Sequence, residues 1–256
     1  MRRVHAHPPD AGDHRYPPTP GQIASEIELT GSACLVGAVP QQWLDTVRRY
    51  VDGVSADVHE VMLEGAAASS LPFLHELTAD PDLLALLDSV TQAARPARDA
   101  ARPGIECALR VINGADTTGH PLWFHYDASM LTVVLPIDIP DAGPGRSGEL
   151  ILCPGHRPYR RRALTNVIEK AITQSDVYRR RFARQLDWNR DTELVPLKPG
   201  NAYLFWGYRS YHATMPIEPG SRRATVILHY RDVHAQSRIV KYAKVFRHRI
   251  DGFGAG

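Results

Sequence analysis

The segment Trp123-Phe124-His125-Tyr126-Asp127 places two potential metal ligands two positions apart. On a β-strand, residues i and i+2 face the same side, so the imidazole of His125 and the carboxylate of Asp127 would converge on one ion. With 12 histidines among 256 residues, such a pair occurs by chance about once in a chain of this composition. A strand-end histidine bonded to its neighbour explains the pair equally well, so the rest of the chain has to decide.

A second imidazole and an arginine follow in order further along the chain. His212 comes after the apolar run 202–206 (AYLFW), and Arg223 leads into the run 226–230 (VILHY). Two histidines and one carboxylate form the facial triad suited to iron(II), which leaves coordination positions open for other ligands. The order of these residues therefore favours a metal centre on a β scaffold.

Short apolar and β-branched runs dominate the chain after residue 104. Gly, Pro, Asp and Asn separate them, which is typical of short strands joined by turns. The runs lie at 105–112, 131–139, 149–153, 202–206 and 224–230. Their spacing predicts antiparallel strands that form a barrel or jelly roll.

Three further segments have helical spacing of their apolar residues. Residues 40–51 and 81–94 precede the strands, and residues 165–186 interrupt them. We therefore expect a mainly β fold of the α+β class, with an N-terminal helical layer and a helical insertion at about 157–187.

The bulk composition is that of an ordinary globular protein, with 43% hydrophobic and 23% charged residues. The formal charge of +2 is too small to imply a nucleic-acid partner. Cys34, Cys107 and Cys153 are odd in number and far apart, which favours free thiols in a reducing cytoplasm over disulfides or a cysteine-bound zinc site. No apolar run has the length of a membrane span.

The first twenty residues lack the apolar stretch that a signal peptide needs. They carry arginines, histidines, prolines and acids, and so have too little apolar surface to fold. We expect a flexible leader over residues 1–20 and a single domain over 21–256, with its β core at about 104–232.

This order of motifs resembles the iron(II)- and 2-oxoglutarate-dependent dioxygenases, and among them the phytanoyl-CoA-dioxygenase-like branch. The family pattern is H-x-D, a distal histidine, and then R-x-S/T. It is matched by His125-Tyr126-Asp127, by His212, and by Arg223-Ala224-Thr225. The resemblance covers about 104–232 and implies a double-stranded β-helix, the jelly-roll architecture also found in cupins.

The resemblance also implies cofactors and a reaction. His125, Asp127 and His212 would bind Fe(II), with 2-oxoglutarate and dioxygen as co-substrates. In this family an Ala or Gly at the carboxylate position goes with halogenation. Asp127 therefore favours hydroxylation of an unactivated C–H bond, with release of succinate and CO2.

The keto acid has several candidate anchors. By resemblance, Arg223 would form a bidentate salt bridge to its distal carboxylate, and Thr225 on the same side of the strand would add a hydroxyl bond. Arg222 would point the other way, although a one-residue bulge would exchange the two arginines. Thr132 would bond the near carboxylate or be an ordinary strand residue. Arg110 would be an anion anchor or a solvent-side charge.

Arginine clusters at 157–162, 179–184 and 238–249 have two interpretations. They form a solvated basic face, or they attract a small-molecule substrate that is anionic or tethered to a carrier. No nucleic-acid-binding motif accompanies them. Four other histidines lack a partner at a spacing typical of metal ligands: His120, His156, His229 and His234. By strand parity, His229 would lie inside the barrel.

Three other functions compete with small-molecule hydroxylation. The first is a 2-oxoglutarate oxygenase acting on a protein or carrier-bound substrate, which a wide basic rim would favour. The second is a cupin-type metalloenzyme without a keto acid, but cupins usually use three histidines and one carboxylate, and Arg223 would have no purpose there. The third is a non-catalytic cupin-like binding module, in which the triad and Arg223 would be free to drift. Metal binding separates the third from the others.

Overall fold

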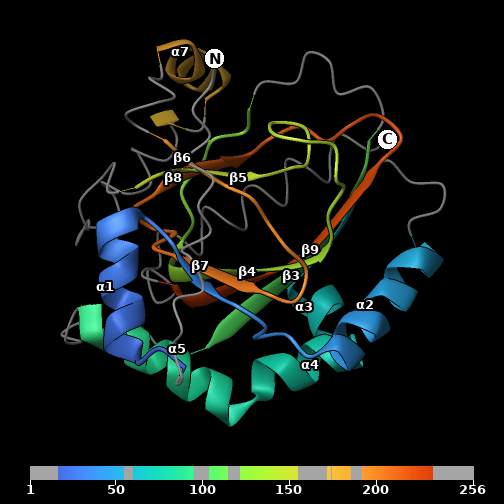
Figure 1. The fold of residues 1–256 in the computed structure, drawn as a ribbon, viewed down its shortest axis with the longest axis vertical. Coiled ribbons are helices and arrows are strands. Elements are labelled where there is room, and N and C mark those ends of the chain that lie inside the picture. Colours follow the sequence, from blue (N-terminus) through green and yellow to red (C-terminus); the bar gives the residue numbers. More distant parts are fainter. Residues whose placement is uncertain are drawn as a thin grey trace.

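The computed structural model describes residues 17–54, 60–94, 104–114, 122–154, 172–173, 175–185 and 192–232. In this part of the chain, two antiparallel sheets face each other, and a layer of helices covers the outer side of the larger sheet (Figure 1). The helices of this layer are α1 (Pro20–Thr30), α2 (Gln41–Val54), α3 (Gly65–Ser69), α4 (Pro72–Ala79) and α5 (Pro81–Ala94).

The strand order of both sheets joins segments that are far apart in the sequence. The larger sheet has the order β1 (Ala33–Leu35), β7 (Ala202–Phe205), β4 (Ser129–Asp138), β9 (Arg222–Asp232), β3 (Ile105–Asn113) and β2 (Glu60–Glu64). The smaller sheet has the order β6 (Glu193–Val195), β5 (Leu150–Cys153) and β8 (Tyr211–Thr214). The chain passes repeatedly between the two sheets, which is the arrangement expected of a double-stranded β-helix.

The outer face of the larger sheet forms the main hydrophobic core with the helices. Alternate residues of each strand point to this face, because the side chains of a strand have a period of two. Leu109 and Val111 of β3 and Val226 and Leu228 of β9 are buried here against the helical layer. Each such side chain contributes about 1.5–3 kcal/mol by leaving water.

The intervening residues of the same strands point to the inner face, toward the smaller sheet. Val134, Tyr203 and Phe205 pack there against Leu150 and Leu152 of β5. Elsewhere on the inner face the strands carry polar side chains that are also buried, namely Thr132, Arg223 and Thr225. The apolar cluster therefore holds the two sheets together, and the polar part of the inner face is available for a site.

The strands and helices expected from the sequence are confirmed within a few residues. The segments 40–51 and 81–94 form α2 and α5, and each of the five apolar runs contains a strand. Helix α1 begins at Pro20, where Thr19 and Gln22 form a capping box. The end of the expected leader is thus the start of a helix, and residues 1–16 lie outside the described part of the chain.

Helix α7 (Asp176–Gln185) is the described part of the expected helical insertion, together with residues 172–173. It lies on the side of the smaller sheet that faces away from the larger one (Figure 1). The rest of 157–187 lies outside the described residues, apart from Ser175.

None of the helices in the described ranges is long and apolar enough to span a membrane.

Candidate metal centre

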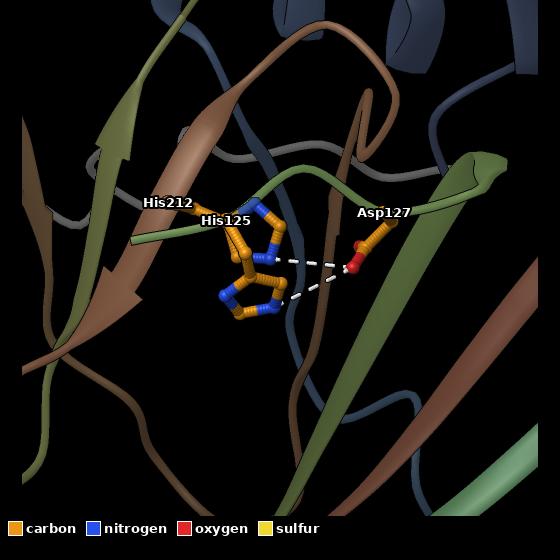
Figure 2. Close-up of side chains that lie close together, drawn as sticks. All are labelled: His125, Asp127 and His212. Carbon is orange, nitrogen blue, oxygen red and sulfur yellow. Dashed lines mark ion pairs between the residues drawn. The ribbon is translucent and has the colours of Figure 1, made fainter. Parts of the chain in front are cut away.

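The side chains of His125, Asp127 and His212 converge at one point between the sheets (Figure 2). Their ligand atoms all lie within 4.8 Å of one another, and no other group of three such residues occurs among the described residues. The Nε2 atoms of His125 and His212 lie 3.6 and 3.5 Å from Oδ1 of Asp127. The sequence-based triad is therefore brought together.

Backbone pairing places the two imidazoles side by side. The amide of His125 donates to the His212 carbonyl at 2.9 Å, and the amide of His212 donates back at 3.0 Å. This bridge is isolated, so residues 123–127 do not form the regular strand that the i, i+2 argument assumed. That expectation was wrong, because Asp127 turns instead to the Gly207 carbonyl, to which its amide donates at 3.0 Å.

Hydrogen bonds to the backbone fix the tautomer of both histidines. Nδ1 of His125 lies 2.9 Å from the Trp123 carbonyl oxygen, and Nδ1 of His212 lies 3.0 Å from the Ser210 carbonyl oxygen. Because a carbonyl only accepts, each Nδ1 carries the proton and each Nε2 presents a lone pair. Such partners orient the imidazoles of metal sites.

The ionisation of the site suits a cation. Burial and the adjacent His212 ring lower the pKa of His125 to about 4, so it is neutral at pH 7 although 41% of its side chain is exposed. Burial would raise the pKa of Asp127, but His212, His229, His125 and a bond from Thr132 outweigh it and hold that pKa below its ordinary value. Two imidazole nitrogens and a carboxylate oxygen thus face one another, as the ligands of a bound cation would.

The donor set matches iron(II). Two imidazole nitrogens and one carboxylate oxygen on one side of an ion leave its other positions open, which is characteristic of non-heme iron(II) oxygenases. The ring of Phe205 packs edge-on against His212, with centroids 4.9 Å apart. The residues present therefore fit an iron ion with an apolar wall beside it.

Arg223 lies on the inner face of β9, and its side chain is almost fully buried. Its Nε donates to the Gly148 carbonyl at 3.0 Å, and its Nη1 donates to the Thr225 hydroxyl at 3.3 Å. Burial and the nearby Arg110 lower the pKa of Arg223 to about 9, against the opposing effect of Glu149, so it stays charged at neutral pH. No carboxylate among the described residues forms an ion pair with it.

Arg222 points to the opposite side. It forms ion pairs of 2.7 Å with Asp138 and with Asp52 of α2. The register of β4 and β9 shifts between Pro136 and Asp138, but this irregularity does not exchange the two arginines. Arg223 is the arginine that faces the smaller sheet.

The other two proposed keto-acid anchors have protein partners. The hydroxyl of Thr132 donates to Oδ2 of Asp127, which gives it a bond that the sequence did not predict. Arg110 pairs with Thr225 across the sheet and so shares its face, but its Nε lies 2.8 Å from Oε1 of Glu60.

Sequence reasoning missed two glycines that make the site possible. A Cβ at Gly207 would lie 2.5 Å from Oδ2 of Asp127 and would overlap the Thr132 hydroxyl. A Cβ at Gly148 would overlap the side chain of Arg223. Glycine is common in turns, so only the three-dimensional contacts distinguish these two from the others.

An aromatic cluster supports the segment that carries His125. Phe124 stacks on Tyr211, and Phe182 of α7 packs edge-on against both rings. Arg179 of α7 is buried, donates to the Phe124 carbonyl at 2.9 Å, and lies over the Trp123 ring. Helix α7 therefore holds the residues immediately before His125.

Of the arginine clusters, only 179–184 falls within the described residues. Arg179 is buried as above, whereas Arg180, Arg181 and Arg184 are exposed. His120, His156 and His234 lie outside the described residues. His229 points to the inner face, as strand parity predicts, and its Nδ1 lies 3.8 Å from Oδ2 of Asp127.

The sequence matches no protein-family model and no curated protein. Solved structures nevertheless share its fold. The epimerase SnoN, in complex with Fe3+, alpha ketoglutarate and nogalamycin RO, has a TM-score of 0.57 at 14% identity and covers 83% of each chain. A prolyl 4-hydroxylase from Phytophthora capsici has a TM-score of 0.53 at 15% identity, over 85% of this chain and 64% of the other.

An oxidoreductase of the 2OG-Fe(II) oxygenase family from Burkholderia pseudomallei has a TM-score of 0.51 at 13% identity, over 84% of this chain and 91% of the other. These likenesses confirm the fold class expected from the sequence. They do not single out the phytanoyl-CoA-dioxygenase-like branch.

Proposed function

We propose that this protein is an iron(II)- and 2-oxoglutarate-dependent oxygenase that hydroxylates an unactivated C–H bond of a small molecule. The observation that carries the proposal is Arg223. A buried guanidinium without a carboxylate partner among the described residues is unfavourable unless an anion joins it. It shares the inner face of the larger sheet with Thr132, which is bonded to Asp127.

His125, Asp127 and His212 would hold the iron, and Arg223 with Thr225 would hold the distal carboxylate of 2-oxoglutarate. The bound iron and keto acid supply the oxidising power, drawn from dioxygen with conversion of 2-oxoglutarate to succinate and CO2. The chain itself orients them. The planar fork of Arg223 suits a carboxylate, and the Gly148 carbonyl and the Thr225 hydroxyl fix the direction of that fork.

The substrate proposed is a small molecule, and the solved relatives include both small-molecule and peptide complexes. SnoN was solved with nogalamycin RO, and a Trichoplax adhaerens prolyl hydroxylase with a peptide fragment. Three exposed arginines on α7 would attract negative charge, so the substrate that we propose is anionic or tethered to a carrier. We also propose a cytoplasmic location, because Cys34, Cys107 and Cys153 are all free thiols.

The test is anaerobic addition of Fe(II) and 2-oxoglutarate to the purified protein, with the visible charge-transfer band of the chelated complex as the readout. We expect a band in the wild type, none in His212→Ala, and none in Arg223→Ala at moderate 2-oxoglutarate. Arg222→Ala is the matched control, because that side chain faces α2, and it should keep the band. A folded wild type that binds Fe(II) but shows no band would refute the role of 2-oxoglutarate.

A further inference from the structure

The two carboxylate oxygens of Asp127 have different surroundings. Oδ1 faces Nε2 of His125 and of His212 (Figure 2). Oδ2 instead accepts the hydrogen bond from the Thr132 hydroxyl. Asp127 is almost fully buried, so solvent does not compete strongly for either oxygen.

The number of protons on each group fixes which group donates in this hydrogen bond and in two further hydrogen bonds linked to it. The Thr132 hydroxyl has one proton, which goes to Asp127, so the contact of 3.1 Å between Thr132 and Ser129 must be donated by Ser129. Ser129 then has no proton left for His229. The contact of 3.1 Å between the Ser129 oxygen and Nδ1 of His229 must therefore be donated by the imidazole.

The result is a one-way chain from His229 through Ser129 and Thr132 to Oδ2 of Asp127. Hydrogen bonds aligned in this manner polarise and strengthen one another in a low-dielectric site. Ser129 and Thr132 belong to β4 and His229 to β9, which pair directly, with Thr132 opposite His229. The chain is thus mounted on the two central strands of the larger sheet rather than on a loop.

Gly207 closes this arrangement from the other side. Its carbonyl accepts from the Asp127 amide, and a Cβ at this position would overlap the Thr132 hydroxyl. No left-handed backbone angle requires glycine here, because Gly207 is not among the glycines with positive φ. The absence of a side chain therefore serves the close approach to the Thr132–Asp127 bond.

We propose that Thr132 is a positioning residue that restricts Asp127 to one ligand oxygen, with Ser129 and His229 bracing it and Gly207 making room for the bond. A carboxylate free to bind through both oxygens would occupy one more position on the ion. By engaging Oδ2, Thr132 keeps that position for an exchangeable ligand. This inference rests on the proposed metal centre and concerns how its carboxylate is held.

The experiment uses Mn(II) alone as the probe and counts metal-bound waters by water-proton relaxation. We expect Thr132→Val to bind Mn(II) with one bound water fewer than the wild type, because the released Oδ2 turns to the ion. Thr132→Ser keeps the hydroxyl and should restore the wild-type number. Thermal unfolding verifies that each variant is folded.

A second variant breaks the same bond from another element. Gly207→Ala should push the Thr132 hydroxyl off the carboxylate and also lose one bound water. Gly53→Ala, with nothing within 4 Å of its added Cβ, is the control and should match the wild type. If Thr132→Val does not fold, Gly207→Ala decides.

The outcomes separate the two proposals. If folded Thr132→Val or Gly207→Ala protein has the wild-type number of bound waters and the wild-type Mn(II) affinity, the positioning role of Thr132 is overturned. The proposed metal centre would still stand. Wild-type protein that binds no Mn(II), or that binds it equally well after His212→Ala, would overturn the metal centre itself.

Discussion

Arg222 and Arg223 are neighbours with opposite environments. Arg222 has two acidic partners at the surface, where such pairs contribute about 0–1 kcal/mol. Arg223 is buried, and the two acceptors of its hydrogen bonds, the Gly148 carbonyl and the Thr225 hydroxyl, are neutral. A charge held in this way lowers the stability of the ligand-free fold, which is common where a site is arranged for its ligand rather than for stability.

Replacing Arg223 by methionine should therefore stabilise the ligand-free protein. Methionine fills a similar volume without a charge, and exchanges of buried charged groups for apolar ones gain about 1–4 kcal/mol in favourable cases. We expect urea unfolding of Arg223→Met to show about 1–2 kcal/mol more stability than the wild type. The same variant should lose 2-oxoglutarate binding. A less stable variant would mean that an acceptor such as the Gly148 carbonyl depends on the guanidinium.

The sequence pointed to the candidate ligands but not to the contacts that hold them. His125, Asp127, His212 and Arg223 are distinguished by residue type and order, which a single sequence displays. The bond from Thr132 to Asp127 depends on how β4 lies against the turn at Gly207, and no local pattern encodes that contact. From the sequence, Thr132 is therefore either a keto-acid ligand or an ordinary strand residue, and neither alternative includes its bond to Asp127.

Among the elements, α7 has the most specific task near the site. The centroid of its Phe182 ring lies 5.1 Å from that of Phe124 and 4.9 Å from that of Tyr211. The same helix carries four arginines. Phe182→Ala should weaken the packing of α7 against the rest of the protein by about 2 kcal/mol, less than for a fully buried ring because Phe182 is only partly buried. Trypsin should then cut faster at Arg180, Arg181 and Arg184.

Val177→Ala is the matched control on the same helix. Val177 is 79% exposed, so its truncation should leave the rate of cleavage unchanged. Equal cleavage of the Phe182→Ala and Val177→Ala proteins would show that the aromatic contacts do not hold α7.

Strand β6 carries a carboxyl group that makes stability depend on pH. Burial raises the pKa of Glu193 from 4.5 to about 7, against the hydrogen bond from Ser32 and with the help of Glu26. Its Oε2 atom is buried and has no hydrogen-bond partner among the described residues. The folded state therefore holds the Glu193 proton more tightly than the unfolded state does.

The direction in which stability changes with pH follows from this difference in proton binding. The stabilising contribution is complete below about pH 4.5 and is lost as the pH rises through about 7. We expect the free energy of unfolding of the wild type to fall on the order of 2 kcal/mol further between pH 5 and pH 8 than that of Glu193→Gln. Parallel pH profiles in urea titrations would contradict this.

Elements with a strong local pattern were predictable, including the four-residue strands β5 and β7, whereas short elements without an apolar run were not. The amphipathic α2 and α5 and the apolar runs of β3, β4 and β9 show their periodicity within the chain itself. Strands β1, β6 and β8 have three or four residues each, and they exist because distant strands pair with them. Helix α1 was missed although the Thr19 and Gln22 capping box is visible in the sequence.

For the whole molecule, the spacing of the apolar runs predicted a barrel or jelly roll, and the resemblance narrowed this to the double-stranded β-helix. Alternation within a strand does not say which strand lies beside it, and the order β1-β7-β4-β9-β3-β2 joins segments from both ends of the chain. This order has a consequence for the site. His212 comes from the smaller sheet, Arg223 comes from the larger one, and Asp127 is bonded to the larger one through Thr132.

A ligand set that contacts both sheets should stabilise the molecule as a unit. A ligand present at about 100 times its dissociation constant adds about 2.7 kcal/mol to the folded state, so Mn(II) and then 2-oxoglutarate should each raise the thermal midpoint by several degrees. Arg222→Ala should show both increments. Arg223→Met should keep the increment from Mn(II) and lose the one from 2-oxoglutarate, because only the carboxylate anchor is gone. If 2-oxoglutarate shifts the midpoint equally in these two variants, it binds elsewhere, and the buried guanidinium requires another anion.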